Sequence, residues 1–220
     1  MSEITLNLIV SYAKSGSNWT RMVLENYLQD TDIPANIWET SSVPNGFSRN
    51  GFEHLMGIPS YLLEAEELWQ LMPIYLKELC ENAKKPLYFK IHDANLGIIP
   101  PEIFSKVRVI YLIRNPLDVV VSYSHHFGVD YDLAIARLEN PLAMFNSPEN
   151  IQRGLLPIRS HAWAEHVASW VDQSDFLVEI LHYEDMVSQP MEQFSRMIQL
   201  FCGELDEKRL KKAIKFSSID

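Results

Sequence analysis

The chain has 220 residues, 47% of them hydrophobic, and a formal net charge of -10 at pH 7. This length and composition suit one globular domain with a substantial core and argue against a disordered or fibrous chain. The acidic charge argues against a nucleic-acid partner, because phosphate contacts need clustered Lys and Arg and only the KRLKK stretch at 208–212 offers such a cluster.

The cysteines and the N-terminal sequence indicate the cellular compartment of the protein. Cys80 and Cys202 lack CxxC or metal-ligand spacing, which favours two free thiols in a reducing compartment. The opening sequence MSEITLNLIV lacks the basic start and long apolar centre of a secretory signal, and no apolar run approaches the length of a membrane span. We therefore expect a cytoplasmic protein without a membrane span.

Short apolar runs alternate along the chain with segments of helical spacing. We expect strands at 4–11, 86–92, 107–113 and 176–183. We expect helices at 17–29, 61–83, 116–127, 160–173 and 190–202. This alternation predicts a three-layer α/β domain with a central parallel sheet flanked by helices. The long loop-like segments 31–60 and 139–157 are expected to form lids or substrate walls.

The stretch YAKSGSNW at 12–19 joins the first expected strand to the first expected helix. The first amides of a helix lack internal partners and carry partial positive charge, which suits an anion. Gly16 allows close approach of the backbone, Ser15 and Ser17 add hydroxyl donors, and Lys14 adds a full charge, as in a phosphate cradle. An ordinary helix cap uses the same residue types, so this stretch alone leaves both interpretations open. It is not a Walker motif, because its lysine precedes the glycine.

A second stretch, VIYLIRNPLDVVVSYSHHF at 109–127, also joins a strand to a helix. Arg114 follows the strand directly, Asn115 and Pro116 begin the helix, and Ser122 lies about two turns inside it. Other polar residues also fall where expected strands end, namely Lys14, His92 and Tyr183. Open α/β sheets bind ligands at that edge, so four separate segments indicate one site.

These stretches resemble the cytosolic-type sulfotransferase family, which transfers a sulfuryl group from 3'-phosphoadenosine 5'-phosphosulfate (PAPS) to a hydroxylated acceptor. YAKSGSNW is similar to the family's YPKSGTTW, and RNPLDVVVSYSHHF to its RNPKDVAVSYYHF. FKIHDA at 89–94 is similar to its KTHLP segment, LHYEDM at 181–186 to LxYEDL, and KFSSID at 215–220 to HTSFE. All five matches occur in family order, and they imply a phosphate-loop topology related to that of nucleotide kinases.

The resemblance implies a role for each matched residue. The residues implied to hold the 5'-phosphosulfate are Lys14, Ser15, Gly16, Ser17 and Asn18, with Trp19 beside the adenine. Arg114 and Ser122 are implied to bind the 3'-phosphate. Tyr183, Ser217 and Ser218 are implied to contact the adenine. His92 matches the general base, and Lys14 and Lys90 match the catalytic positive charges.

Other histidines compete for the catalytic role, because assigning a general base depends on geometry. They are His125, His126, His161 and His166, and the adjacent pair at 125 and 126 is interpreted as structural or acceptor-lining. A lone histidine at the end of a strand is also often structural. No metal is expected, because the sequence has no HExxH motif, EF-hand loop or clustered His and Cys.

The sequence departs from the family pattern at three places. Ala13 stands where the family has proline, and Asp93 and Ala94 stand where it has Leu-Pro after the histidine. The sequence also stops at Asp220, before any Arg-Lys-Gly or GxxGxWK segment. We therefore expect residues 1–220 to be a single sulfotransferase domain lacking its C-terminal segment, with its oligomeric state left open.

Two other functions remain open at this stage. A nucleotide or small-molecule kinase uses a related loop, although it needs a Mg²⁺-binding carboxylate and normally a GK[ST] sequence. A non-catalytic module would bind 3'-phosphoadenosine nucleotides without transfer.

The expected acceptor is a small, hydrophobic, hydroxylated molecule in a partly aromatic cleft. The aromatic residues that could line such a cleft, or lie in the core instead, are Trp38, Phe47, Phe52, Tyr61, Trp69, Tyr75, Phe127, Tyr131 and Phe145.

Overall fold

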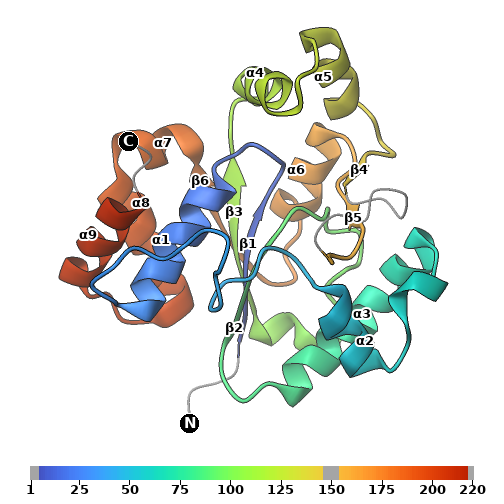
Figure 1. Ribbon diagram of the computed structural model, residues 1–220, viewed down its shortest axis with the longest axis horizontal. Coiled ribbons are helices and arrows are strands. Elements are labelled where there is room, and N and C mark those ends of the chain that lie inside the picture. Colours follow the sequence, from blue (N-terminus) through green and yellow to red (C-terminus); the bar gives the residue numbers. More distant parts are fainter. Residues whose placement is uncertain (1–4, 146–153, 218–220) are drawn as a thin grey trace.

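A parallel sheet of four strands forms the centre of the protein (Figure 1). The computed structural model describes residues 5–145 and 154–217. The strands are β1 (Leu6–Ser11), β2 (Leu87–Ile91), β3 (Val107–Ile113) and β6 (Leu177–His182). They lie in the order β2-β1-β3-β6, and every neighbouring pair is parallel. The predicted α/β architecture is therefore confirmed.

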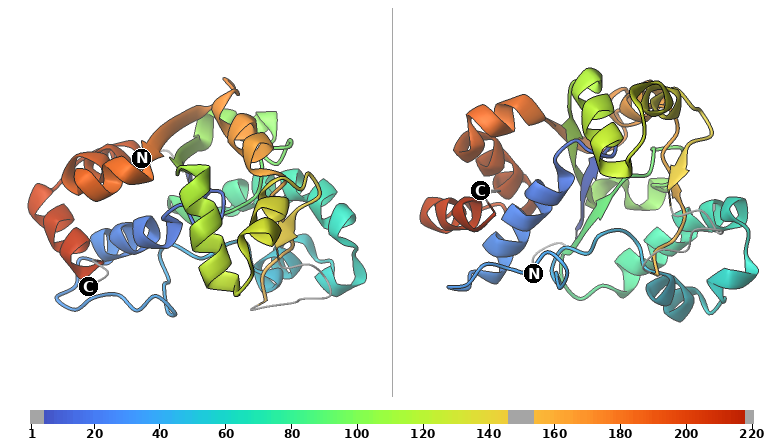
Figure 2. Two further views of the ribbon diagram at one scale, coloured as in Figure 1. Left: turned by 90° about the horizontal axis from the view of Figure 1, so that it is seen from above. Right: turned by 45° about the horizontal axis from the view of Figure 1, so that its top comes forward.

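Helices cover both faces of this sheet, as the two further views show (Figure 2). One face packs against α1 (Ser17–Gln29), α8 (Pro190–Cys202) and α9 (Glu207–Phe216). The other packs against α3 (Ala65–Asn82) and α6 (Trp163–Val171). Side chains alternate along β1, so that Leu8 and Val10 join the cluster with α3 while Ile9 joins the cluster with α1. Because helices cover both faces, the central strands β1 and β3 are almost fully buried and mainly apolar, as in other parallel sheets.

Smaller elements complete the fold. Above the carboxyl ends of the strands stand α4 (Pro116–Phe127) and α5 (Tyr131–Leu138), followed by an antiparallel pair of β4 (Met144–Phe145) and β5 (Ile158–Arg159) (Figure 1). The remaining helices are α2 (Arg49–Met56) and α7 (Tyr183–Ser188), with 3-10 turns η1 (Ser60–Leu62) and η2 (Pro101–Lys106). No helix in the described ranges is long and apolar enough to cross a membrane.

Three expected segments differ from the structure for local reasons. The helix expected from 61 begins at Ala65, because Glu64 and Glu67 form a capping box that fixes the start. The helix expected from 160 begins at Trp163, because His161 has a φ of 57° that a continuous helix does not allow. The segment 31–60 is not a loop throughout, since α2 lies within it and buries Phe52. Residues 146–153 of the expected loop 139–157 lie outside the described residues.

Candidate active site

The strand order has a switch point at the carboxyl edge of the sheet, between β1 and β3. From β1 the chain continues to β2 on one side of it, and then to β3 on its other side. Ligands of open α/β sheets bind where the chain direction switches in this way. The YAKSGSNW loop leaves the end of β1, and Arg114 follows β3 directly, so both predicted segments flank this switch point.

The loop after β1 has the backbone of an anion cradle. Lys14 has a φ of 70° and Gly16 a φ of 93°, and Gly16 is the N-cap of α1. The first hydrogen bond of the helix runs from the Thr20 amide to the Gly16 carbonyl at 3.1 Å, so the amides of residues 17–19 precede the internal ladder. The Ser15 hydroxyl is buried and has no hydrogen-bond partner within the described chain. Amides and a hydroxyl therefore lie at the positive end of the α1 dipole.

Gly16 is required by a close contact as well as by its backbone. A Cβ atom at position 16 would lie 2.7 Å from Cδ2 of Tyr183, the first residue of α7. The Arg114 guanidinium lies over the same ring, 4.3 Å from its centre. Arg114 Nη1 also donates to the Lys14 carbonyl at 2.9 Å, and Arg114 Nε is buried without a described partner. Three predicted segments, distant in sequence, thus meet at one point.

Lys90 is a buried lysine at the end of β2. Its Nζ donates to Asn45 Oδ1 at 2.9 Å. Burial, together with the smaller effect of the positive charges of Arg21 and Lys14, lowers the pKa of Lys90 to about 7. The pKa of Lys14 is also lowered, first by burial and then by Arg114. Positive groups are therefore gathered here closely enough to oppose one another, which favours an anionic ligand.

The loop that carries Asn45 is anchored by two charged residues on the buried side of α1. Arg21 donates to Thr40 Oγ1 at 2.7 Å and to the Ile37 carbonyl at 3.0 Å. The carboxylate of Glu25 accepts from the backbone amides of residues 41–43 at 2.7 to 3.1 Å. The sequence analysis missed Arg21, Glu25 and Asn45. The available signal was a pair of opposite charges, four residues apart, on the predicted helix 17–29.

His92 lies just past β2, with a hydrogen bond that fixes its tautomer. Its Nδ1 lies 2.6 Å from the Ser11 carbonyl, and because a carbonyl only accepts, Nδ1 carries the proton. Burial lowers the pKa of His92 well below its usual value, and the charge of Lys90 adds to this effect. The ring is therefore neutral at neutral pH and presents the lone pair of Nε2. Nε2 has no hydrogen bond to a described residue.

The competing histidines are used differently. His166 is buried with both nitrogens engaged: Nδ1 accepts from the Tyr111 hydroxyl at 2.9 Å, and Nε2 donates to the His92 carbonyl at 3.2 Å. His161 Nε2 accepts from Arg159 Nε at 3.0 Å. His125 and His126 are exposed in the last turn of α4. His92 is thus the histidine placed beside Lys90 at the carboxyl edge.

The other predicted nucleotide-binding residues differ in exposure and in their partners. Asn18 is exposed, and the Trp19 ring packs edge-on against Phe194 at 5.1 Å. Ser122 is half-buried in α4. Ser217 donates to the Ala213 carbonyl and accepts from Asn26, ten residues and about 15 Å beyond Gly16 along α1. Ser218 lies outside the described residues.

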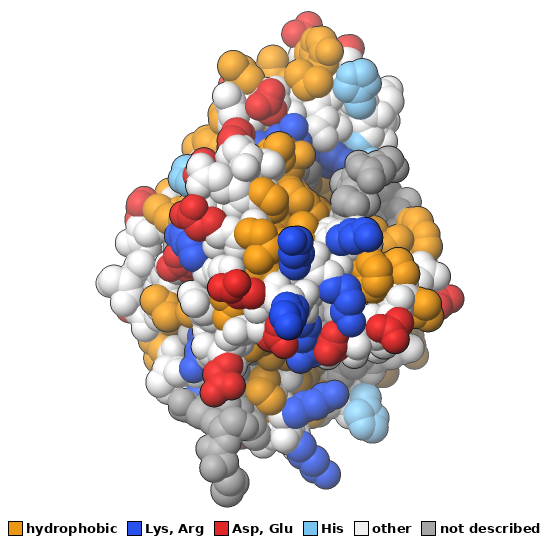
Figure 3. Space-filling view, turned by 90° about the vertical axis from the view of Figure 1, so that its left-hand side faces the viewer, with side chains coloured by type: hydrophobic (Ala, Val, Ile, Leu, Met, Phe, Trp, Pro, Cys, Tyr) orange, Lys and Arg blue, Asp and Glu red, His pale blue; other side chains and the backbone are white. Residues whose placement is uncertain are grey.

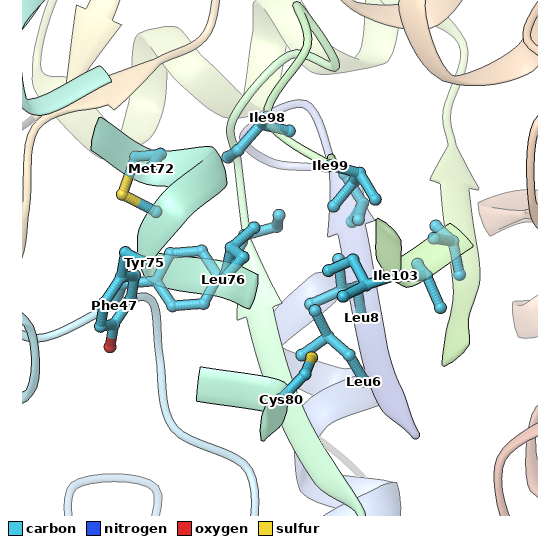
Figure 4. Close-up of a cluster of buried hydrophobic side chains, with 14 of the residues drawn as sticks. Leu6, Leu8, Phe47, Met72, Tyr75, Leu76, Cys80, Ile98, Ile99 and Ile103 are labelled. Carbon is cyan, nitrogen blue, oxygen red and sulfur yellow. The ribbon is translucent and has the colours of Figure 1, made fainter. Parts of the chain in front are cut away.

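The aromatic residues considered for the cleft divide into three groups. Phe47, Phe52 and Tyr75 belong to the core beside α3, which decides between the two environments left open for them; Figure 4 shows Phe47 and Tyr75 in this cluster. Those that are exposed are Trp38, Tyr61, Phe127 and Tyr131. Trp69 lies beneath the Arg159 guanidinium, at 5.1 Å from its ring centre. Phe145 lies 6.4 Å from His92 between ring centres, which makes it an apolar neighbour of the candidate base.

Two basic side chains of helix α9, in contrast, form ion pairs with nearby acidic residues. Lys212 Nζ lies 2.7 Å from Asp30 and 3.9 Å from Asp32, and Arg209 lies 3.8 Å from Asp30. Figure 3 shows basic and acidic side chains intermingled on the face that α8 and α9 present, without a continuous basic track on this face. Among the residues described, no group of three His, Cys, Asp or Glu is placed to hold a metal ion.

Comparison with known proteins identifies the family. The family model described as the sulfotransferase domain matches residues 7–220. The chain belongs to the sulfotransferase domain family. Sulfotransferase 1E1 of Rattus norvegicus is 29% identical over 194 residues, which cover 87% of this chain and 57% of that protein. This sulfotransferase domain thus spans less than two thirds of that relative's length.

Solved structures share the fold of this sulfotransferase domain. Mouse sulfotransferase SULT7A1, complexed with PAP, has a TM-score of 0.60 at 18% identity, covering 99% of this chain and 65% of its own. Retinol dehydratase in complex with androsterone and inactive cofactor PAP has a TM-score of 0.59 at 19% identity, covering 97% of this chain and 64% of its own. The predicted phosphate-loop topology agrees with these neighbours.

Proposed function

We propose that this sulfotransferase domain transfers a sulfuryl group from PAPS to a hydroxyl of a small hydrophobic acceptor. One observation carries the proposal: Lys14, Lys90 and Arg114 converge with a neutral histidine at the switch point of an otherwise acidic chain. A donor with phosphate and sulfate groups complements that charge.

The donor site fits the nucleotide on structural grounds. The buried Ser15 hydroxyl and Arg114 Nε have no described partners, and both are groups that an anion satisfies. We assign Lys14, Ser15, Gly16, Ser17 and Asn18 to the 5'-phosphosulfate, and Arg114 with Ser122 to the 3'-phosphate. Trp19, Tyr183, Ser217 and Ser218 are assigned to the adenine. The PAP in the two structural neighbours supports this choice of nucleotide.

The chemistry assigned to the chain is proton transfer and charge stabilisation. PAPS, when bound, supplies the sulfuryl group and a phosphate leaving group. His92 Nε2 accepts the proton of the acceptor hydroxyl, because the Ser11 carbonyl keeps the other proton on Nδ1. Lys14 and Lys90 stabilise negative charge that develops on the transferred and leaving groups. Asn45 holds the Lys90 side chain in place for this role.

The acceptor is expected to meet apolar surface beside the base. Phe145 lies near His92 and also packs against Tyr12, with 6.5 Å between ring centres. These rings favour an acceptor whose hydroxyl is attached to a hydrophobic body. Androsterone in one structural neighbour is consistent with that class of molecule.

The function is tested by titrating 3'-phosphoadenosine 5'-phosphate and ATP in parallel by calorimetry. Tighter binding of the 3'-phosphorylated nucleotide, abolished in a folded Arg114→Ala variant, supports the donor site. Transfer of labelled sulfate from PAPS to a panel of phenols and hydroxysteroids then tests catalysis. Preference for ATP would favour a kinase, and PAP binding without transfer would favour a binding module.

A further inference from the structure

The first turn of α7 joins the two segments assigned to the donor phosphates. The Tyr183 ring lies against Gly16 and also beneath the Arg114 guanidinium. The next residue, Glu184, accepts a hydrogen bond from the Asn115 amide through Oε1 at 3.1 Å. Two consecutive residues of α7 therefore contact two consecutive residues after β3.

The hydrogen bond from Asn115 fixes the peptide that follows Arg114. Asn115 is the N-cap of α4, and its side chain and carbonyl already accept from Leu117 and Val119. Its amide lies outside the helix ladder, and the Glu184 carboxylate is its acceptor. Because a peptide unit is planar, holding the Asn115 N–H also sets the orientation of the Arg114 carbonyl and backbone.

We propose that Glu184 is a positioning residue that holds Arg114 in place for the 3'-phosphate, an inference that rests on the proposed donor site. A small cavity of about 290 Å³ beside Arg114 is also lined by Asn115 and Glu184. A carboxylate at this cavity repels an anion, so its charge and its hydrogen bond have opposite effects on phosphate affinity. If charge dominates, removing Glu184 strengthens binding; if positioning dominates, removal weakens it.

Three variants separate these contributions. Glu184→Ala removes both the charge and the acceptor, whereas Glu184→Gln removes the charge and keeps an amide oxygen that accepts from Asn115. Asp185→Ala is the matched control, because it removes the neighbouring exposed carboxylate in the same turn. The measured quantity is the affinity for 3'-phosphoadenosine 5'-phosphate divided by that for adenosine 5'-phosphate, obtained by calorimetry. This selectivity ratio isolates the contribution of the 3'-phosphate.

We expect Glu184→Ala to lower the selectivity ratio about fivefold or more while the affinity for adenosine 5'-phosphate changes less than about twofold. Asp185→Ala should keep the ratio within about twofold of wild type, and Glu184→Gln should keep or raise it, because the repulsive charge is removed while the acceptor for Asn115 is kept. An unchanged or higher ratio in Glu184→Ala, an equal loss for both nucleotides, or a loss in Glu184→Gln as large as in Glu184→Ala overturns the assignment. A wild-type chain that does not prefer the 3'-phosphorylated nucleotide overturns the donor site itself, before any variant is compared.

Discussion

Replacing Gly16 with alanine should disrupt the point where the phosphate loop meets α7. The added methyl carbon would lie 2.7 Å from Cδ2 and 3.1 Å from Cε2 of Tyr183. The φ of 93° costs a residue with a Cβ about 1 to 2 kcal/mol, and overpacking against the ring costs about 1 to 3 kcal/mol. We therefore expect Gly16→Ala to lower the free energy of unfolding by about 2 to 5 kcal/mol.

Gly57 provides a matched control for the backbone contribution. Its φ is 68°, and a Cβ there meets no atom within 4 Å, so Gly57→Ala should cost only about 1 to 2 kcal/mol. Urea unfolding followed by circular dichroism measures both losses, and calorimetry measures the affinity for 3'-phosphoadenosine 5'-phosphate. Displacing Tyr183 also displaces the Arg114 guanidinium, so Gly16→Ala should weaken binding at least about tenfold while Gly57→Ala should not. Equal stability losses with wild-type affinity in both variants would refute this reasoning.

The remaining predictions concern groups around the same edge. His92→Ala should lower turnover by about 10² to 10⁴ with nucleotide affinity nearly unchanged, and equal loss of both, by initial rates and calorimetry, would argue against a base. The folded pKa of Lys90, about 7, lies below its unfolded value, so above pH 7 the unfolded chain binds more protons than the folded chain. The free energy of unfolding of the wild type should therefore rise from pH 7 to about 10 relative to that of Lys90→Met. If urea unfolding gives the same pH dependence for both proteins, this prediction is contradicted. Glu25→Ala leaves three amides without their acceptor and should cost about 3 to 5 kcal/mol in urea unfolding, whereas a loss below about 1 kcal/mol would show that water replaces the carboxylate.

The sequence predicted the residues whose placement depends on the ends of strands. An apolar run and the polar residue that follows it are adjacent in the chain, and parallel strands bring such ends to one edge. Lys14, His92 and Arg114 could therefore be placed together without knowledge of any side-chain contact. The helix α1 was predicted with its observed bounds because its apolar spacing and N-terminal glycine are local signals.

Other features depend on contacts between distant segments. The hydrogen bond between Asn45 and Lys90 joins residues 45 positions apart and leaves no periodic pattern. Helix α7 has six residues, too few for a periodic pattern to identify it. Phe47 and Tyr75 could not be assigned to the core or to a cleft, because both environments select aromatic side chains and only the packing of α3 on the sheet distinguishes them.

The strand order has a consequence for how the chain folds during synthesis. β1 is synthesised first but lies between β2 and β3, so it remains without both neighbours until residue 113 has been made. The contact between Arg114 and the Lys14 carbonyl spans 100 residues, and Tyr183 is made later still. Contacts of such separation form late because they close long loops. A ligand that needs all these segments can stabilise only a chain that already extends past Tyr183, so it would act on a late stage in the folding of this domain and leave earlier intermediates unprotected.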